Sequence, residues 1–496
     1  MLANMLESVG VRNMTADDSD ESEDDEDIKF GPDWIQLVIS NTRDHGDKHS
    51  SSDKPKKKRK RRWKCRKKLP YSSSLFYRDY HSPTVRDLDH IDAKEFRLDY
   101  RMPWNQAHRI VSIFVHRKWV LTQEDLNERG VFGHRVCPPE IKILGTLYWL
   151  GEGCSFRTIY NLSGRVLTAQ SFRDFAKKFT RKVKKFLAPK FIKIPRTVAE
   201  LTAVSKTFET RGFPGACGST DGVQIAWEGC PYAYRHSFTG KEKYPTLGFN
   251  VTVDHNMRVI HVCSMFAGRF NDKTKVLYDT YVQKLRSGFY DGFSYNLRDP
   301  EGVVTTHNTP YLICDGGYHR WVQLMCPMKT TSVKMFALFS KLLESVRKDA
   351  ECTFGVMKKR FKVSGLGSRV CVNEDVCSYY VPKVFPHCQV LKVPLLFREV
   401  SFMEDIFITC CVLHNMLLDH DCPFREGCFR LDPCSGHKRR VLVNNVNRLL
   451  RRNDDYSYTE QGGLDPMTTT QIDSDFSAMR RRLACHTYYM FKNRLI

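Results

Sequence analysis

An alternating run of apolar residues near the middle of the chain sets the strongest constraint on its fold. Every second position from 247 to 253 is apolar, the period of a β-strand with one buried face: Leu247, Phe249, Val251 and Val253. Asp254, His255 and Asn256 then supply turn chemistry, and residues 259–266 are predicted to return as the hairpin partner. The chain is therefore expected to build a β-sheet around this hairpin.

The elements around the hairpin follow an order typical of one α/β fold. A strand is predicted at 218–227, a helix from Asp272 to about 286, and further strands at 310–314 and 322–326. Apolar residues then recur every three or four positions from Phe339 to Phe361, which predicts a long amphipathic helix. Three strands, a helix, a strand, a short strand and a helix is the order of a ribonuclease-H-like α/β domain. We place this domain at residues 205–420.

Residues 87–195 are predicted to form an all-α region. Apolar residues follow helical spacing after Pro138 and Pro139, and shorter helices are predicted at 156–162 and 168–179. This pattern is helix-turn-helix-like, and a plain helical bundle has the same pattern. The last helix is basic and carries four candidate contacts to DNA phosphates: Arg173, Lys177, Arg181 and Lys184. A solvated helix face is the alternative explanation.

The first 70 residues contain two blocks of like charge and are expected to be disordered. Nine of the eleven residues from 17 to 27 are acidic, and twelve of the fifteen from 54 to 68 are Lys or Arg. Such blocks bury too little apolar surface to offset chain entropy. Five basic residues resemble a monopartite nuclear-localisation signal that an importin reads: Lys56, Lys57, Lys58, Arg59 and Lys60. We expect a nuclear protein, with a nonspecific nucleic-acid arm as the alternative role of this run.

The excess of positive charge belongs to the folded body. The chain has 78 Lys and Arg against 56 Asp and Glu, a formal net charge of +22, and the first 70 residues contribute only +2. A body this basic commonly binds a polyanion, most often nucleic acid, although a generic solubility surface is the alternative.

Composition excludes other classes of protein. A hydrophobic content of 41% excludes a fibrous or wholly disordered chain. The sequence has no uninterrupted apolar stretch of about 18 residues, so no membrane span is expected. No secretory signal is expected either, because the N-terminal residues lack a basic stretch followed by an apolar one, and the 18 cysteines are expected to be reduced thiols.

Three acidic residues stand at the ends of the predicted elements. Asp221 lies on the first strand, Asp315 just past the fourth, and Glu351 on the long helix, with 35 residues between Asp315 and Glu351. In a ribonuclease-H-like fold the first and fourth strands are neighbours and the helix packs across their ends, so the three carboxylates should converge. Clustered carboxylates repel unless a cation neutralises them, and oxygen ligands select Mg²⁺ or Mn²⁺.

Such a cluster suggests cleavage of phosphodiester bonds. Two metal ions about 3.5–4 Å apart can activate a water or a 3′-hydroxyl and stabilise the leaving oxygen. Each acid also has a simpler explanation. Asp221 and Asp315 precede glycines, as ordinary turn residues do, and Glu351 could pair with Arg347 one helical turn earlier.

Several segments resemble motifs of the PIF/Harbinger transposases. The first-aspartate motif is matched by Gly218-Ser219-Thr220-Asp221-Gly222 and the second by Leu312-Ile313-Cys314-Asp315-Gly316-Gly317-Tyr318. The third-acid helix is matched by Arg347 and residues 351–361, and a late helix by Cys411-Val412-Leu413-His414-Asn415. Asn271, next to Asp272, stands where the family has a histidine.

This resemblance covers about residues 90–420 and implies a function. It implies a DDE superfamily endonuclease and transposase that cleaves and joins double-stranded DNA at transposon ends. Asp221, Asp315 and Glu351 would be its catalytic and metal-binding residues, with two Mg²⁺ or Mn²⁺ ions. Candidate partners besides DNA and importin are a Myb/SANT-like protein and a second copy of the chain.

Two alternatives to an active transposase stay open. The first is a domesticated nuclear DNA- or chromatin-binding protein that keeps the fold with little or no catalysis. Domesticated copies commonly lose an acid, and the presence of all three here favours activity. The second is another ribonuclease-H-like nuclease that acts on RNA, which the motifs match less well.

Two further groups of polar residues are assigned no chemistry, and the last residues form a basic extension at 421–496. Four zinc-ligand types occur together, but their five-residue gaps are wider than usual: Cys422, Cys428, Cys434 and His437. His414 and Asn415 lie in an apolar helix and are expected to be a buried, hydrogen-bonded pair. Within the extension, Arg480, Arg481 and Arg482 precede three aromatic residues, which predicts a basic amphipathic helix.

Overall fold

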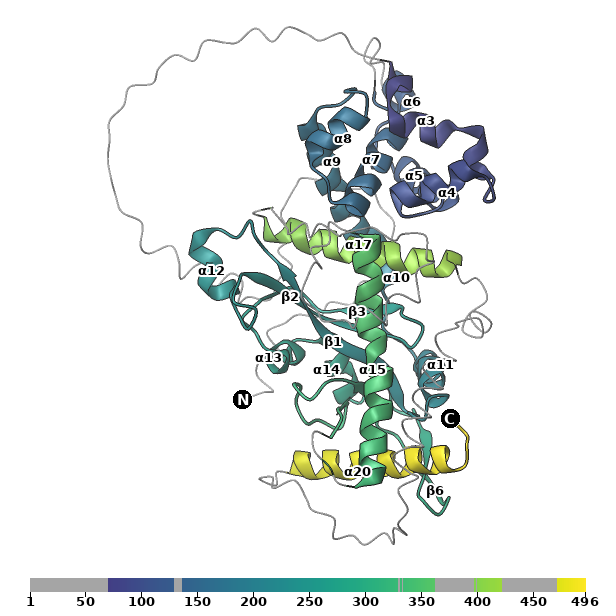
Figure 1. Ribbon diagram of the computed structural model, residues 1–496, viewed down its shortest axis with the longest axis vertical. Coiled ribbons are helices and arrows are strands. Elements are labelled where there is room, and N and C mark those ends of the chain that lie inside the picture. Colours follow the sequence, from purple (N-terminus) through teal and green to yellow (C-terminus); the bar gives the residue numbers. More distant parts are fainter. Residues whose placement is uncertain are drawn as a thin grey trace, which may run out of the picture. The chain divides into compact units, whose positions relative to one another are not determined.

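A mixed α/β structure is formed by the residues that the computed structural model describes: 70–128, 136–328, 331, 333–361, 397, 399–421 and 471–496 (Figure 1). Three predictions concern residues outside these ranges. They are the disordered tail up to residue 69, the localisation run at 56–60, and the group of Cys422, Cys428, Cys434 and His437.

Helices α3 to α11 precede the sheet. Their bounds are α3 Leu75–His81, α4 Ile91–Tyr100, α5 Trp104–His116, α6 Gln123–Glu128, α7 Pro139–Glu152, α8 Phe156–Leu162, α9 Ala169–Lys182, α10 Ala188–Phe191 and α11 Val198–Glu209. 3₁₀ turns lie at Tyr71–Ser73 and Pro83–Arg86, and a π-helical turn, Val183–Leu187, joins α9 to α10. The helices predicted after Pro138 and at 156–162 and 168–179 are confirmed. Ser155 and Thr168 cap the last two by accepting backbone N–H groups.

The main sheet is mixed and has the order β3-β2-β1-β7-β8, with β4 also paired to β2. The bounds are β1 Ala216–Ala226, β2 Thr246–Val253, β3 Val259–Val262, β4 Phe266–Ala267, β7 Tyr311–Ile313 and β8 Leu324–Met325. Strands β1, β2 and β3 pair antiparallel, whereas β7 is parallel to both β1 and β8. The first strand and the strand at 310–314 are therefore neighbours, as predicted.

Two elements differ from the sequence prediction. The single helix expected from Asp272 is two helices, α13 Asp272–Leu277 and α14 Thr280–Arg286. The break occurs because Asp279 caps α14 by accepting the backbone N–H groups of Tyr281 and Val282. The expected hairpin partner at 259–266 is divided into β3 and β4, which pair with opposite ends of β2. Helix α12 (Tyr232–Phe238) and the small hairpin of β5 (Tyr295–Arg298) and β6 (Val304–His307) were not predicted.

Helix α15 (Lys334–Arg360) packs on β1, β2 and β7 and is the long amphipathic helix that the sequence predicted (Figure 1). Helix α20 (Gln471–Lys492) packs on α15 and β5. Its side chains Phe476 and Leu483 belong to the same core cluster as Tyr311 of β7. The helix predicted in the basic extension is confirmed, but the sequence did not predict that it contributes to the core of the α/β region.

Helix α17 (Val400–Asp421) is a core helix. Among the described helices it has the length and hydropathy of a membrane span, but 78% of that stretch is buried inside the protein. His414 and Asn415 on this helix are fully buried and hydrogen-bonded, as expected. The Asn415 amide accepts from Val259 N–H (3.0 Å) and donates to the carbonyl oxygens of Val259 (2.7 Å) and Phe191 (2.8 Å). One side chain thus joins α17 to β3 and α10.

We expect Asn415→Ala to lower the free energy of unfolding by about 3 kcal/mol or more, because it leaves several buried backbone groups unpaired. Urea unfolding measures the change. Asn493→Ala is the matched control, because that exposed amide also donates to a backbone carbonyl, Tyr489 O. The control should change stability by less than about 0.5 kcal/mol. Equal effects of the two substitutions would contradict this role for Asn415.

Candidate active site

Asp221 and Asp315 are brought together by the parallel pairing of β1 and β7. Ser219 pairs with Ile313, and each aspartate lies two residues further along its own segment. Strand β7 ends at Ile313, so Asp315 begins a turn, and its Oδ1 accepts the N–H of Gly317 at 2.7 Å. Asp221 stays on β1, where its Oδ1 accepts the N–H of Gly222 at 2.9 Å.

Helix α15 presents Glu351 and Arg347 to this strand end. The two residues are four apart and share one face of the helix. Ser219 Oγ donates to the carbonyl oxygen of Arg347 at 3.1 Å, which fixes the helix against β1. The Arg347 guanidinium lies 2.7 Å from Glu351 Oε1, 3.1 Å from Glu344 Oε2 and 3.7 Å from Asp221 Oδ2. Arg347 therefore connects Asp221 to Glu351, and the pairing of Glu351 with Arg347 is the simpler explanation weighed from sequence.

The carboxylates around Arg347 outnumber this one guanidinium. Burial raises the pKa of Asp221 to about 7; Arg347 opposes this shift, while the charges of Asp315 and Glu351 add to it. The three acids therefore lie within electrostatic reach of one another. Among the described residues, however, no three side chains of His, Cys, Asp or Glu are grouped so as to hold a metal ion. Arg347 supplies the positive charge.

Another carboxylate, Asp272 on α13, lies against β1 on the other face of the sheet. A Cβ at Gly222 would clash with Asp272 Oδ1, so the glycine leaves room for this carboxylate. The ammonium of Lys275, a residue only 1% exposed, lies 3.1 Å from Asp272 Oδ1. Asn271, which replaces the histidine of the PIF/Harbinger pattern, caps α13 by accepting the N–H of Thr274 at 2.8 Å. The sequence predicted Asp272 as the N-cap of this helix, but the cap is Asn271, and the contact of Asp272 with β1 was not predicted.

A buried hydrogen-bond network behind the acids was missed from sequence. Tyr318, three residues after Asp315, donates from its hydroxyl to Asn250 Oδ1 at 2.6 Å. The Asn250 amide donates to Thr220 Oγ1 at 3.1 Å and to Asp279 Oδ2 at 2.6 Å. His261 lies 3.3 Å from Asp279 Oδ1. Because Tyr318 anchors the turn that carries Asp315, this network holds Asp315 next to β1.

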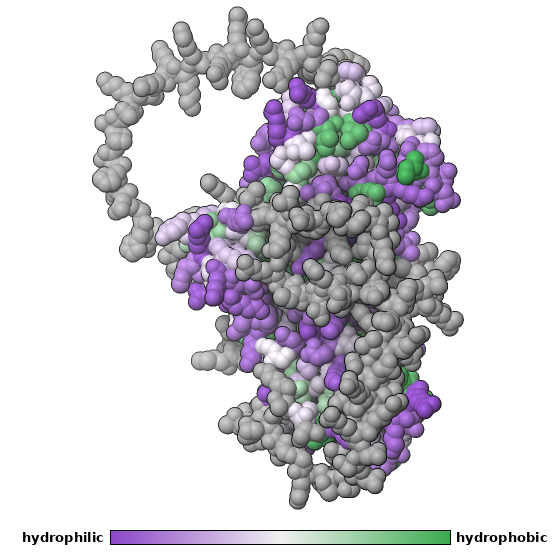
Figure 2. Space-filling view, viewed as in Figure 1, coloured by the Kyte–Doolittle hydropathy of each residue, from purple (hydrophilic) through white to green (hydrophobic). Residues whose placement is uncertain are grey.

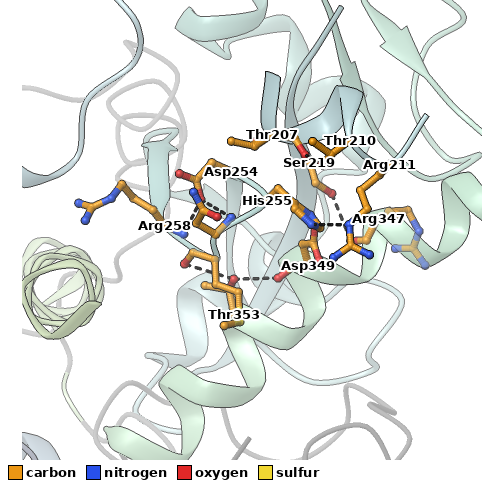
Figure 3. Close-up of polar contacts among 12 residues, drawn as sticks. Thr207, Thr210, Arg211, Ser219, Asp254, His255, Arg258, Arg347, Asp349 and Thr353 are labelled. Atoms are coloured by element: carbon orange, nitrogen blue, oxygen red, sulfur yellow. Dashed lines mark hydrogen bonds and ion pairs between the residues drawn. The ribbon is translucent and has the colours of Figure 1, made fainter. Parts of the chain in front are cut away.

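The turn between β2 and β3 contacts α15 through His255 and Asp349 (Figure 3). His255 Nδ1 lies 2.5 Å from Asp349 Oδ2, and Arg211 Nε donates to His255 Nε2 at 3.0 Å. Thr353, one turn further along the helix, donates to the carbonyl oxygen of Asp349 at 2.7 Å. Residue 349 lies about 200° around the helix from 347, since each residue turns it by 100°. The turn therefore fixes the rotation that points Arg347 toward Asp221.

The predicted DNA-contact face, on α9 and the π-helical turn after it, lies against residues 397 and 399–405, just before and at the start of α17. Lys177 lies 2.5 Å from Glu399, and Lys184 lies 2.7 Å from Glu404 and 3.0 Å from Asp405. The Arg173 guanidinium lies 5.9 Å from the Phe397 ring, and Arg181 is exposed. Phosphates would have to replace the ion pairs of Lys177 and Lys184 to contact these side chains.

The comparisons with known proteins relate the α/β region to transposons. A family model described as plant transposon protein matches residues 190–392, which include every strand of the main sheet and α15. This segment contains Asp221, Asp315 and Glu351. Comparison with the curated proteins and with the solved structures gave no match.

The raised pKa of Asp221 predicts how stability depends on pH. An acid whose pKa rises from 3.8 to about 7 on folding binds a proton more tightly in the folded state. It therefore lowers stability progressively as pH rises from about 4 through 7. In EDTA, we expect Asp221→Asn to melt at a higher temperature than the wild type at pH 8 and at an equal temperature near pH 4.

Thermal unfolding followed by circular dichroism at several pH values measures this difference. Asp291→Asn, which changes an exposed aspartate, should leave the melting temperature unchanged across the range. A variant Asp221→Asn that melts below the wild type at pH 8 would show that the ion pair with Arg347 outweighs the burial of Asp221.

Proposed function

We propose that this chain is a DDE transposase of the PIF/Harbinger type, a metal-dependent endonuclease that cleaves and joins DNA phosphodiesters. One observation carries the proposal. The parallel register of β1 and β7 places Asp221 beside Asp315, and α15 brings Glu351 toward them, within the segment that matches plant transposon proteins. The strand order β3-β2-β1-β7-β8, antiparallel and then parallel, supports a ribonuclease-H-like fold.

The donor chemistry of these residues fits Mg²⁺ or Mn²⁺. Asp221, Asp315 and Glu351 are all carboxylates, the ligands that these ions prefer. Burial raises the pKa of Asp221 most, and the charges of Asp315 and Glu351 raise it further against the opposing effect of Arg347. Bound ions would activate the attacking oxygen and stabilise the leaving oxygen of the phosphodiester. Glu351 is bound to Arg347 in the structure, so it would exchange this partner in order to join the two aspartates.

The remaining residues keep the acids in register. The Asn250 network holds Asp315 near β1, and the His255–Asp349 pair sets the rotation of α15. Double-stranded DNA is the proposed substrate because the chain carries a net charge of +22. The coloured part of the surface in Figure 2 is mostly hydrophilic. We propose further that the DNA substrate is a transposon end, that the protein acts in the nucleus, and that residues 87–195 bind DNA as a helix-turn-helix region. The proposed partners are importin, a Myb/SANT-like protein and a second copy of the chain.

A second candidate function is favoured by one specific contact. Arg347 already joins Asp221 to Glu351, and a permanent link of this kind would keep a metal out. The chain would then be a domesticated nuclear DNA- or chromatin-binding protein with little or no catalysis. It would bind duplex DNA with the steep salt dependence expected from its charge, without nicking it.

Nicking of supercoiled plasmid with Mg²⁺ or Mn²⁺ separates the two functions. We expect the wild type to nick the plasmid and Asp315→Asn to nick it more than about 100-fold more slowly. Loss of a residue that only orients a metal ligand already lowers activity by about 10- to 100-fold, and Asp315 is proposed as a ligand itself. Asp291→Asn is the matched control and should retain full nicking. Binding of all three proteins to duplex DNA in EDTA, measured by fluorescence anisotropy, should be alike.

Full nicking by Asp315→Asn would overturn the assignment of the acids. A wild type that binds duplex DNA but never nicks it, with either metal, would support the second candidate.

A further inference from the structure

A stack of three planar side chains follows the turn that carries Asp315. The rings of His319 and Trp321 are stacked, with centroids 4.6 Å apart and planes 12° from parallel. The guanidinium of Arg286, at the end of α14, lies 3.8 Å from the centre of the Trp321 ring. Arg286 is exposed, and His319 and Trp321 are half-buried. This stack takes no part in the acid centre described above.

The stack is held in place on both sides. His319 Nε2 lies 3.1 Å from the carbonyl oxygen of Lys273 and must donate to it, because a carbonyl can only accept. Burial lowers the pKa of His319, and the charges of Lys273 and Arg286 lower it further, so the imidazole is neutral near pH 7. Trp321 packs against the core cluster of the α/β region. The aromatic surface is therefore preformed.

Its position is close to the acid centre. Burial raises the pKa of Tyr318, directly before His319, and Asp221, Asp272 and Asp315 lie near enough for their charges to raise it further. Four residues of chain reach no further than about 14 Å, which limits the distance from Asp315 to His319. A DNA strand rises about 3.4 Å per nucleotide, so a few nucleotides cover that distance. The exposed side chains of Lys273 and Arg286 add positive charge along the way.

We propose that the His319–Trp321–Arg286 stack binds an unpaired base of a DNA strand beside the phosphodiester held at Asp221, Asp315 and Glu351. Aromatic faces stack with any base, and a neighbouring arginine adds a cation–π contribution. A base can reach such a surface only outside the duplex, so the ligand is a single-stranded or unpaired segment. This inference rests on the proposed function, since it concerns the same DNA strand.

A second stack of the same residue types provides an internal control. Trp104 and His108 on α5 have ring centroids 4.7 Å apart and planes 9° from parallel, and the Arg86 guanidinium lies 4.8 Å from the Trp104 ring. Trp104 Nε1 donates to the carbonyl oxygen of Tyr80 at 3.0 Å. These residues lie outside the segment that matches transposon proteins. Substitution of Trp104 removes the same kind of ring from the helical region.

The test uses the full chain in EDTA and a duplex oligonucleotide with a 3′ overhang that carries 2-aminopurine, a base whose fluorescence falls when it stacks. We expect the wild type to quench the overhang probe and to bind it more tightly than a flush duplex. Trp321→Ala and His319→Ala should each weaken overhang binding by about 5- to 100-fold, the range that loss of one stacking ring gives. Trp321→Phe should retain most of the affinity.

Neither variant should change binding to the flush duplex, whereas Trp104→Ala should leave the preference for the overhang over the flush duplex unchanged. If His319→Ala and Trp321→Ala, both folded by circular dichroism, bind the overhang as the wild type does, the stack does not bind bases. Equal losses on both probes would instead indicate contact with the duplex backbone and overturn the proposal. The assay requires no cleavage, so Asp315→Asn tests the nuclease function separately.

Discussion

A half-buried carboxylate on the central strand is the constraint around which the α/β region is organised. Asp221 sits on β1 where burial disfavours its charge, so its environment has to provide a compensating cation. Arg347 provides it from α15, and the same guanidinium also contacts Glu351 and Glu344. One positive charge therefore serves several carboxylates, and the centre keeps an excess of negative charge.

The other contacts make this arrangement rigid. The turn after β2 holds α15 through His255 and Asp349, at a position facing away from Arg347. On the other face of the sheet, the Asn250 amide links β1 to Tyr318 and so to the turn that carries Asp315. The three acids come from separate elements, and each element has its own buried polar anchor. The stack at His319 and Trp321 extends from the same turn.

Local patterns predicted much of this from the sequence, and long-range contacts account for what they missed. The alternation from Leu247 and the apolar period of α15 predicted a strand and a helix, because each repeats within a short window. The break between α13 and α14 was missed because an aspartate can lie on the surface of one continuous helix or cap a second one. In the structure Asp279 caps α14, and Asn250 of β2 holds it there. Lys177 was predicted to contact DNA, and this stays a prediction; its ion pair with Glu399 could not be predicted because the two residues are 222 apart along the chain.

Local sequence patterns specify which residue types stand at the acid centre and in what order their strands and helix follow. They do so because strand and helix periods are local, and because Asp221, Asp315 and Glu351 fall at element ends. Which charges meet depends on the folded arrangement of the chain. The partners of Arg347, the Asp272 carboxylate against Gly222 and the stacking of Arg286 on Trp321 all depend on packing between distant segments, where burial sets the strength of each contact.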